Sequence, residues 1–467
     1  MSLAYHRLPV TAFDALSSDG TELIGLLRRS QYSKHALLLR GIGEQAPAAY
    51  GLLATAQRKN PDAVGTVVRY PSVGVWAYRT MLACRGGPRI PGASPDLLGN
   101  IAAAAAIRAE LPAELTVPVS DGQVVLPSLG IADAPAASTA TVQVTSAGTH
   151  VRSASGHVTI PPDCHAAAVG WRPLRPVLPT TGEMGGIVVD DVDPFRMPAV
   201  PHMVTVSDLD RWRPAFADAW ELLRLHHPAV AAEVAAVVSA VIPLASPAHG
   251  QVSSSSPEAF GAVAMSEPID ARTLAVTLAH EVQHMKLSAV LDLVPLTHPD
   301  DGSRYYAPWR DDPRPAGGLL QGTYAYLGVT RFWRRQRSVG VTPDSVAHAE
   351  FARWRDAALL GCTTLLGSGQ LTEDGERFVR LMAATLRRWQ DEPVPETARR
   401  LAAEKNERHR ARWESQHGLA HADALPPALT LRSAESRSRN PAGALPRRPR
   451  YPGDRCQGSP GTGPGSR

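Results

Sequence analysis

Residues 270–294 read DARTLAVTLAHEVQHMKLSAVLDLV, with no proline or glycine in the run. Apolar residues recur in this stretch with a helical period, and Asp is a favoured residue just before the first turn of a helix. We therefore expect one long helix that begins after Asp270 and packs an apolar face, formed by Leu274, Leu278, Val282 and Met285, against a core.

The middle of this helix carries His280-Glu281-Val282-Gln283-His284, an H-E-x-x-H motif. Positions i and i+4 share one helical face, so both imidazoles can reach one metal ion. Glu281 lies beside them and can act on a metal-bound water. The alternative is a helix with two core histidines, but a chance match is expected only about 0.03 times in a chain of this size. We therefore predict a divalent metal site at His280 and His284.

A third protein ligand is not evident from the spacing. Leu287 and Val290 stand where Gly and His would continue the metzincin motif. The first Glu after the motif is Glu350, and the nearest acid is Asp292. The choice stays open between these acids and three further candidates, which are Gln321, Tyr324 and Tyr326.

A loop rich in Pro, Trp and Arg follows the helix. It reads YYAPWR at 305–310 and continues as DPRP at 312–315. Arg310 and Arg314 offer planar forks that suit a carboxylate, so the loop is a candidate anion-binding lid. Ion pairs with Asp301, Asp311 or Asp312 are the alternative role for both arginines.

The sequence pattern changes along the region that precedes the motif. Helical periodicity dominates from about residue 14 to 106, whereas residues 115–192 alternate Val and Thr between Gly and Pro and include one strand that ends in acids at 185–191. Helices are expected again later, including 318–337, 343–366 and 372–389. We predict an α+β, predominantly helical protein with a helical region at 1–114, a β-rich region at 115–200 and a helical metal-binding domain at 201–430.

Charge and composition set the C-terminus apart. Residues 431–467 hold eight Arg against Glu435 and Asp454, among many Pro, Ser and Gly, and we expect a disordered tail there. The net charge of +4 is a property of this tail, so it does not indicate nucleic-acid binding. The four cysteines are scattered, and we find no secretory signal and no apolar run long enough for a membrane. We expect a cytoplasmic protein without a membrane partner.

Several segments resemble the H-E-x-x-H proteins of actinobacterial gene clusters that make modified ribosomal peptides. The matching segments are Ser266-x-Pro268, residues 274–284, 286–289 and 291–296, APWR at 307–310, GLLQG at 318–322 and DDVDPFR at 190–196. Such proteins occur alone or fused behind radical SAM maturases. The resemblance covers most of residues 20–390.

The resemblance implies a hydroxylase that uses Fe(II) and 2-oxoglutarate to place oxygen on the β-carbon of a residue in a ribosomally synthesised precursor peptide, with a radical SAM maturase as a second partner. It implies His280 and His284 as metal ligands, Glu281 as the catalytic group that orients a ligand or water, and Arg310 as the anchor for 2-oxoglutarate. His is usual in this family where the chain has Tyr326, which makes Tyr326 the implied third-ligand candidate.

Two other functions fit the same residues. A zinc peptidase would bind Zn²⁺ in place of iron, with Glu281 as the general base and Glu350 or Asp292 as third ligand. A non-catalytic protein would bind the peptide or the maturase without chemistry, in keeping with Tyr326 at the family's histidine position. The metal held by the native protein separates these three functions.

Overall fold

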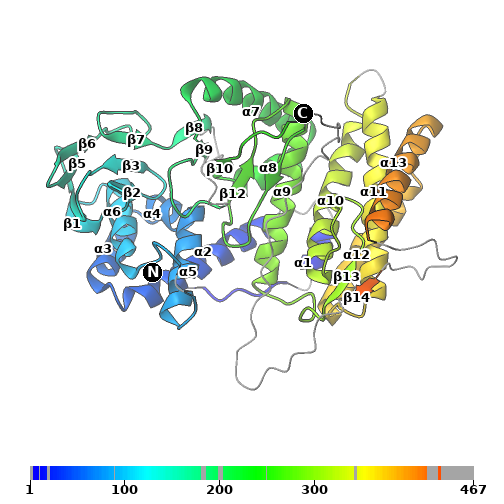
Figure 1. Ribbon diagram of the computed structural model, residues 1–467, viewed down its shortest axis with the longest axis horizontal. Coiled ribbons are helices and arrows are strands. Elements are labelled where there is room, and N and C mark those ends of the chain that lie inside the picture. The colour runs from blue at the N-terminus through cyan, green and yellow to red at the C-terminus, as the bar shows by residue number, and fades with distance from the viewer. Residues whose placement is uncertain are drawn as a thin grey trace, which may run out of the picture.

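The computed structural model describes residues 4–9, 11–17, 22–88, 90–179, 186–197, 203–248, 250–340, 344–417 and 430–432. The fold is α+β and predominantly helical, as predicted. Helix α9 (Ala271–Leu291), which carries the H-E-x-x-H motif, lies near the middle of the molecule (Figure 1). Most helices and strands of the N-terminal half lie on one side of it, whereas the helices that follow it in the chain lie on the other, together with α1 (Ala12–Ser17), which packs on α12 (Glu373–Gln390).

Short helices build the N-terminal region. They are α1 (Ala12–Ser17), α2 (Glu22–Gly43), α3 (Pro47–Lys59), α4 (Pro61–Val68), α5 (Pro71–Cys84), a 3-10 turn η1 (Pro95–Leu97) and α6 (Leu98–Arg108). Proline begins α3, α4 and α5, and its fixed φ and missing N–H favour the first position of a new helix. The alanine run of α6 is buried, and its small side chains allow α3 and α4 to pack closely on it.

The predicted β-rich region forms two small antiparallel sheets that pack on α6. One sheet has the order β1-β4-β5-β6, from strands β1 (Ala113–Pro118), β4 (Thr139–Thr145), β5 (Gly148–Ser153) and β6 (Gly156–Ile160). The other has the order β2-β3-β7, from β2 (Gln123–Leu126), β3 (Gly130–Asp133) and β7 (Trp171–Pro173). In β4, buried and more exposed residues alternate, which is the pattern that predicted it.

A third sheet lies next to α9 and has the order β11-β12-β10-β9-β8. Its strands are β8 (Arg175–Leu178), β9 (Ile187–Val189), β10 (Ala240–Pro243), β11 (Ser253–Ser254) and β12 (Ala262–Met265). Strands β9, β10 and β12 are parallel, and the two edge strands are antiparallel to their neighbours. The sheet joins strands from both sides of residue 200, where the sequence predicted a boundary between a β-rich and a helical region.

The remaining elements are α7 (Val206–His226), α8 (Pro228–Val237), β13 (Ser303–Tyr305), α10 (Ala316–Gln336), α11 (Ser345–Gly367), α12 (Glu373–Gln390), α13 (Glu396–Gln416) and β14 (Thr430–Arg432). Of these, α7, α8 and α10 pack on α9, α11 packs on α10, and α12 and α13 pack on α11. The helices predicted at 318–337, 343–366 and 372–389 correspond to α10, α11 and α12. Strand β14 pairs with β13 and includes the first two residues of the predicted tail. The rest of that tail, residues 433–467, lies outside the described residues.

Two large hydrophobic cores hold the molecule together. One joins α7 to α12 with β9, β10 and β12, and it contains the predicted apolar face of α9. The other joins the end of α2 and helices α3 to α6 with the strands that follow them, whereas α1 and the start of α2 belong to the first core. Within the described ranges, no helix is both long and apolar enough to cross a membrane.

Candidate metal site

Helix α9 begins where the sequence predicted. The Asp270 side chain accepts a hydrogen bond from the backbone N–H of Thr273, 2.8 Å away, and thereby caps the first turn. Every residue from Leu278 to Leu287 is buried, so the motif lies inside the protein on nearly three turns of helix. Burial on all sides means that polar side chains in this stretch need partners from neighbouring elements.

The two motif histidines face each other. Their Nε2 atoms are 3.1 Å apart. The Nδ1 atom of His284 lies 3.1 Å from the side-chain oxygen of Gln321, whose amide nitrogen in turn donates to the Ser288 hydroxyl. An oxygen acceptor at Nδ1 fixes the proton there and leaves Nε2 of His284 with its lone pair. Burial, with the neighbouring His284 as the second cause, holds the pKa of His280 well below its usual value, so that its ring is neutral at pH 7.

This geometry fits a shared metal ion. Two imidazole nitrogens that are each about 2.0–2.1 Å from one ion lie about 2.9–3.4 Å apart for octahedral to tetrahedral angles. The observed separation of 3.1 Å falls in that range. Among the residues that the structure describes, however, no group of three His, Cys, Asp or Glu side chains gathers where it could hold a metal ion. His280 and His284 therefore supply a two-nitrogen site without a carboxylate, thiolate or third imidazole from the described ranges.

Glu281 is buried and is oriented by the edge strand β11. The Ser253 hydroxyl donates to Glu281 Oε1 over 2.7 Å. Nothing in the sequence spacing links Ser253 to the motif. The contact holds the carboxylate on the flank of the helix next to the two imidazoles.

Tyr326, the implied third-ligand candidate, lies against His280. Helix α10 brings its ring to 5.1 Å from the His280 ring, centroid to centroid, at an edge-on angle of 73°. Trp309 stacks on the other side of Tyr326 at 4.7 Å, and Trp354 of α11 packs at 4.3 Å. The sequence placed Trp309 in a lid over the helix, but it gave no signal for Trp354. The three aromatic rings form a wall beside His280.

Two glycines, Gly322 and Gly361, leave room for the Trp309 ring beside Tyr326. A Cβ atom at Gly322 would lie 2.3 Å from Trp309 Nε1, and one at Gly361 would lie 3.2 Å from the far edge of the same indole. Any side chain at residue 322 would therefore displace Trp309 from Tyr326. The GLLQG segment at 318–322 thus has two roles at the site, since it also supplies Gln321.

Arg310 and Arg314 share a partner within the loop. Arg310 Nε donates to one oxygen of Asp312 over 2.6 Å, and Arg314 Nη1 donates to the other over 3.2 Å. Backbone hydrogen bonds between Tyr305 and Arg314, of 2.8 and 2.9 Å, close the loop at its base. The loop places Trp309 against Tyr326. The arginine fork of Arg310 meets Asp312, which is one of the ion-pair partners considered as the alternative.

The two acids named for a zinc peptidase have other partners. Asp292 accepts hydrogen bonds from Lys34 at 2.6 Å and from Gln31 at 2.9 Å, which join α2 to the end of α9. Glu350 pairs with Lys405 of α13 at 2.7 Å. Tyr324, another candidate, is buried on α10 with its ring 5.6 Å from the Lys286 ammonium. These contacts engage the three side chains in links between helices.

A second buried polar cluster follows strand β9. The Tyr70 hydroxyl donates to Asp190 over 2.7 Å, and the Ser72 hydroxyl donates to Asp193 over 2.6 Å. The remaining carboxylate oxygens accept backbone N–H groups, from Asp193 at 2.9 Å for Asp190 and from Phe195 at 2.8 Å for Asp193. Burial, with Asp190 as the second cause, raises the pKa of Asp193 to about 7. This acid cluster ties the end of β9 to the start of α5.

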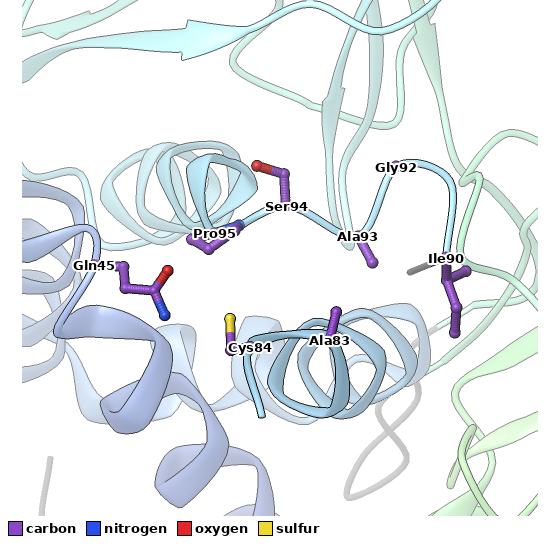
Figure 2. A pocket seen from close by; sticks show the side chains of 8 residues that line it. All are labelled: Gln45, Ala83, Cys84, Ile90, Gly92, Ala93, Ser94 and Pro95. Carbon is purple, nitrogen blue, oxygen red and sulfur yellow. The ribbon is translucent and has the colours of Figure 1, made fainter. Parts of the chain in front are cut away.

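An open pocket of about 360 Å³ lies in the N-terminal region, where residues between Gln45 and Pro95 line it (Figure 2). Gln45, Cys84 and Ser94 contribute its polar atoms, and Ile90 and Pro95 are among its apolar walls. It contains no histidine and no carboxylate, so it offers neither a metal site nor an acid–base pair.

Comparison with known proteins does not assign the chain to a family. No protein-family model matches the chain, and a search of curated proteins finds none with significant similarity.

Proposed function

We propose that the protein is an Fe(II) and 2-oxoglutarate-dependent hydroxylase that acts on a residue of a ribosomally synthesised precursor peptide, with His280 and His284 as iron ligands. The observation that carries the metal site is the 3.1 Å approach of the two Nε2 atoms, with Gln321 fixing the proton of His284 on the far nitrogen. The hydroxylase activity and its peptide substrate come from the family resemblance.

The protein side of the site supports an oxygenase better than a peptidase. An octahedral iron that binds a bidentate 2-oxoacid and dioxygen has three positions left for protein groups, which His280, His284 and Tyr326 would fill. A zinc peptidase needs a third protein ligand. Its named candidates Asp292 and Glu350 pair with lysines instead. When bound, iron with 2-oxoglutarate supplies an activation of dioxygen in which one oxygen atom enters the substrate C–H bond and the other enters succinate, with loss of CO₂.

The chain's own residues then have distinct tasks. Tyr326 supplies the third protein group or, together with Trp309, excludes water from the side of His280. Glu281, held by Ser253, orients a ligand or water beside the metal. Arg310 binds the distal carboxylate of 2-oxoglutarate by exchanging Asp312 for it. Asp312 is about half exposed, at 51%, so its carboxylate can turn toward solvent when the carboxylate of 2-oxoglutarate takes its place.

The compartment and partners follow from the substrate. A ribosomally made peptide is modified where it is synthesised, and we infer a cytoplasmic protein that works beside a radical SAM maturase. Cys84, Cys164 and Cys362 are free thiols, as expected for a reducing compartment. The proposed reaction involves neither a nucleic acid nor a membrane as a partner.

Anaerobic titration of 2-oxoglutarate into the Fe(II)-loaded protein tests the proposal. A 2-oxoacid that chelates ferrous iron through both oxygens gives a visible charge-transfer band, and we expect this band to saturate at one equivalent. Arg310→Ala should weaken 2-oxoglutarate binding roughly tenfold or more and leave iron binding intact, because a charge-assisted fork is lost. Arg310→Lys should recover only part of the affinity, since an ammonium cannot form the fork.

The other outcomes identify the rival functions. Zinc in the native protein, with peptide cleavage that Glu281→Gln abolishes, would establish a peptidase. Absence of tight metal from protein produced with iron and zinc available would establish a binding protein. Equal 2-oxoglutarate affinity in wild type and Arg310→Ala would remove Arg310 from the site and make Arg314 the next residue to test.

A further inference from the structure

Two buried side chains of α9, Gln283 and Lys286, form a hydrogen-bonded network with Glu233 of α8. Lys286 donates to Glu233 Oε1, Gln283 donates to Glu233 Oε2 over 2.9 Å, and Lys286 also donates to the side-chain oxygen of Gln283 over 3.0 Å. The three residues are 1–3% exposed. Neither the motif nor the proposed chemistry uses them, although two of them lie within two residues of His284.

Desolvating such a pair is costly. A buried ion pair is often no more stable than apolar residues of the same size, so its presence is weak evidence for a stabilising role. The best-attested use of such groups is to fix the register of packed helices. The network therefore calls for an explanation in terms of geometry.

Helix α9 needs such a device because its hydrophobic packing does not define its rotation. All residues from Leu278 to Leu287 are buried, so α9 has no exposed face in this stretch that would orient it. Rotation by one residue is about 100° and would carry both imidazoles off the site. Directional hydrogen bonds can fix the rotation where non-directional burial cannot.

Neighbouring elements form hydrogen bonds with α9 on both sides of the histidine pair. On a helical projection, Glu281 lies about 80° to one side of the midpoint of the histidine pair, and Gln283 lies about 80° to the other side. Ser253 of β11 holds Glu281, and Glu233 of α8 holds Gln283. Strand β11 and helix α8 both contact α9.

Helix α10 closes the space around Gln283. A Cβ atom at Gly328 would lie 2.5 Å from Gln283 Cγ and 3.3 Å from the carbonyl oxygen of Ala279. The backbone of α10 thus lies directly against the Gln283 side chain and keeps it turned toward Glu233. The same helix carries Gln321 and Tyr326, so the register of α9 also sets how these residues meet the histidines.

We propose that Glu233 is a positioning residue: through Lys286 and Gln283 it fixes the rotation of α9 that brings the Nε2 atoms of His280 and His284 together for a metal ion. This inference rests on the metal site of the proposed function.

Variants that separate stability from positioning test it. Glu233→Gln and Lys286→Met each leave a buried partner unpaired, and both should lower the melting temperature and weaken metal binding. The double variant Glu233→Leu/Lys286→Met removes both charges and leaves only the neutral Gln283 amide, which still reaches the Ala279 carbonyl oxygen at 3.4 Å, so it should recover most of the melting temperature lost in the single variants. Its affinity for Co²⁺, followed by the visible spectrum of the bound ion, should stay at least tenfold weaker than that of wild type, with an altered spectrum.

A matched control is Arg272→Met, which removes another ion pair of α9, the 2.8 Å contact with Asp344 at its exposed first turn. It should leave Co²⁺ affinity and spectrum unchanged. If the double variant recovers metal affinity together with stability, the network is only structural and the inference fails, while the metal site stands. If wild type binds no Co²⁺, Zn²⁺ or Fe²⁺, the proposed function fails and this inference fails with it.

Discussion

Two buried polar clusters of this protein use their polar atoms in opposite ways. In the acid cluster after β9, Asp190 and Asp193 direct their carboxylate oxygens outward, each to a hydroxyl or a backbone N–H of its surroundings. On α9, His280 and His284 direct ring nitrogens toward each other. The contact between His284 Nδ1 and the side-chain oxygen of Gln321 fixes the His284 ring in that orientation.

The difference distinguishes a structural cluster from a candidate functional one. Buried polar groups are normally satisfied by the protein itself, and the acid cluster follows this rule. Two imidazole Nε2 atoms 3.1 Å apart suit either a hydrogen bond from one ring to the other or a cation bound by both. We therefore expect substitutions in the acid cluster to change stability and substitutions on α9 to change metal binding.

The largest effect is expected at the histidines. His280→Ala and His284→Ala should each reduce bound metal to background, because one imidazole cannot hold a divalent ion alone in this site. The unfolding free energy of the metal-free protein should change far less than in the acid-cluster variants. Metal analysis after dialysis, together with urea unfolding of metal-free samples, measures both quantities. Full stoichiometric metal in either variant would contradict the assignment.

The next largest effect is expected at Asp190. Asp190→Ala leaves the Tyr70 hydroxyl and two backbone N–H groups without an acceptor in the interior, and we expect a loss of about 3 kcal/mol or more in unfolding free energy. Metal stoichiometry should stay that of wild type. Asp190→Asn retains one acceptor oxygen and should be less destabilised. A stable Asp190→Ala protein that loses metal would reverse the roles of the two clusters.

Asp193 makes the acid cluster sensitive to pH. Because its folded-state pKa is raised to about 7, the native state keeps a proton that the unfolded chain releases above about pH 4. Its stabilising contribution is thus complete at low pH and is lost as the pH rises through that window. Compared with Asp193→Asn, wild type should lose up to about 1.4 kcal/mol per pH unit between about pH 4 and 7. Parallel stability profiles of the two proteins would show that Asp193 does not titrate in this range.

A smaller effect is expected at Tyr326. Tyr326→His places the residue that is usual in the resembled family beside His280, and we expect metal affinity to rise roughly tenfold, or about 1.4 kcal/mol. Tyr326→Phe keeps the stacking on Trp309 and serves as the control for ring packing. Metal competition against a chelator measures both variants. Weaker binding by the histidine variant than by wild type would mean that residue 326 is not directed at the metal.

The sequence predicted the elements with strong local signals. Asp270, the unbroken run after it and the periodic apolar residues were sufficient for α9, and the helices α10 to α12 were placed to within a few residues. The local sequence does not separate α8, which ends at Val237, from β10, which begins at Ala240. Strands of a covered parallel sheet are buried on both faces, so β10 and β12 lack the alternation that marked β4.

The site was predicted only in part, for a similar reason. His280, Glu281 and His284 lie on one helix, where spacing determines which residues share a face. Ser253, Trp354 and Glu233 reach the motif through tertiary packing alone. Glu233 and Lys286 lie 53 residues apart in sequence, and nothing in either local sequence pairs them. The contact of Arg310 with Asp312 depends on the conformation of the loop that carries both residues.

The most direct test of the metal site is the metal content of the wild-type protein, purified from cells supplied with both iron and zinc. We expect about one equivalent of divalent metal per chain, bound through His280 and His284, with iron in the freshly isolated protein under anaerobic conditions. Protein that is folded, as judged by a cooperative thermal transition, but carries no metal and binds none on titration would contradict it.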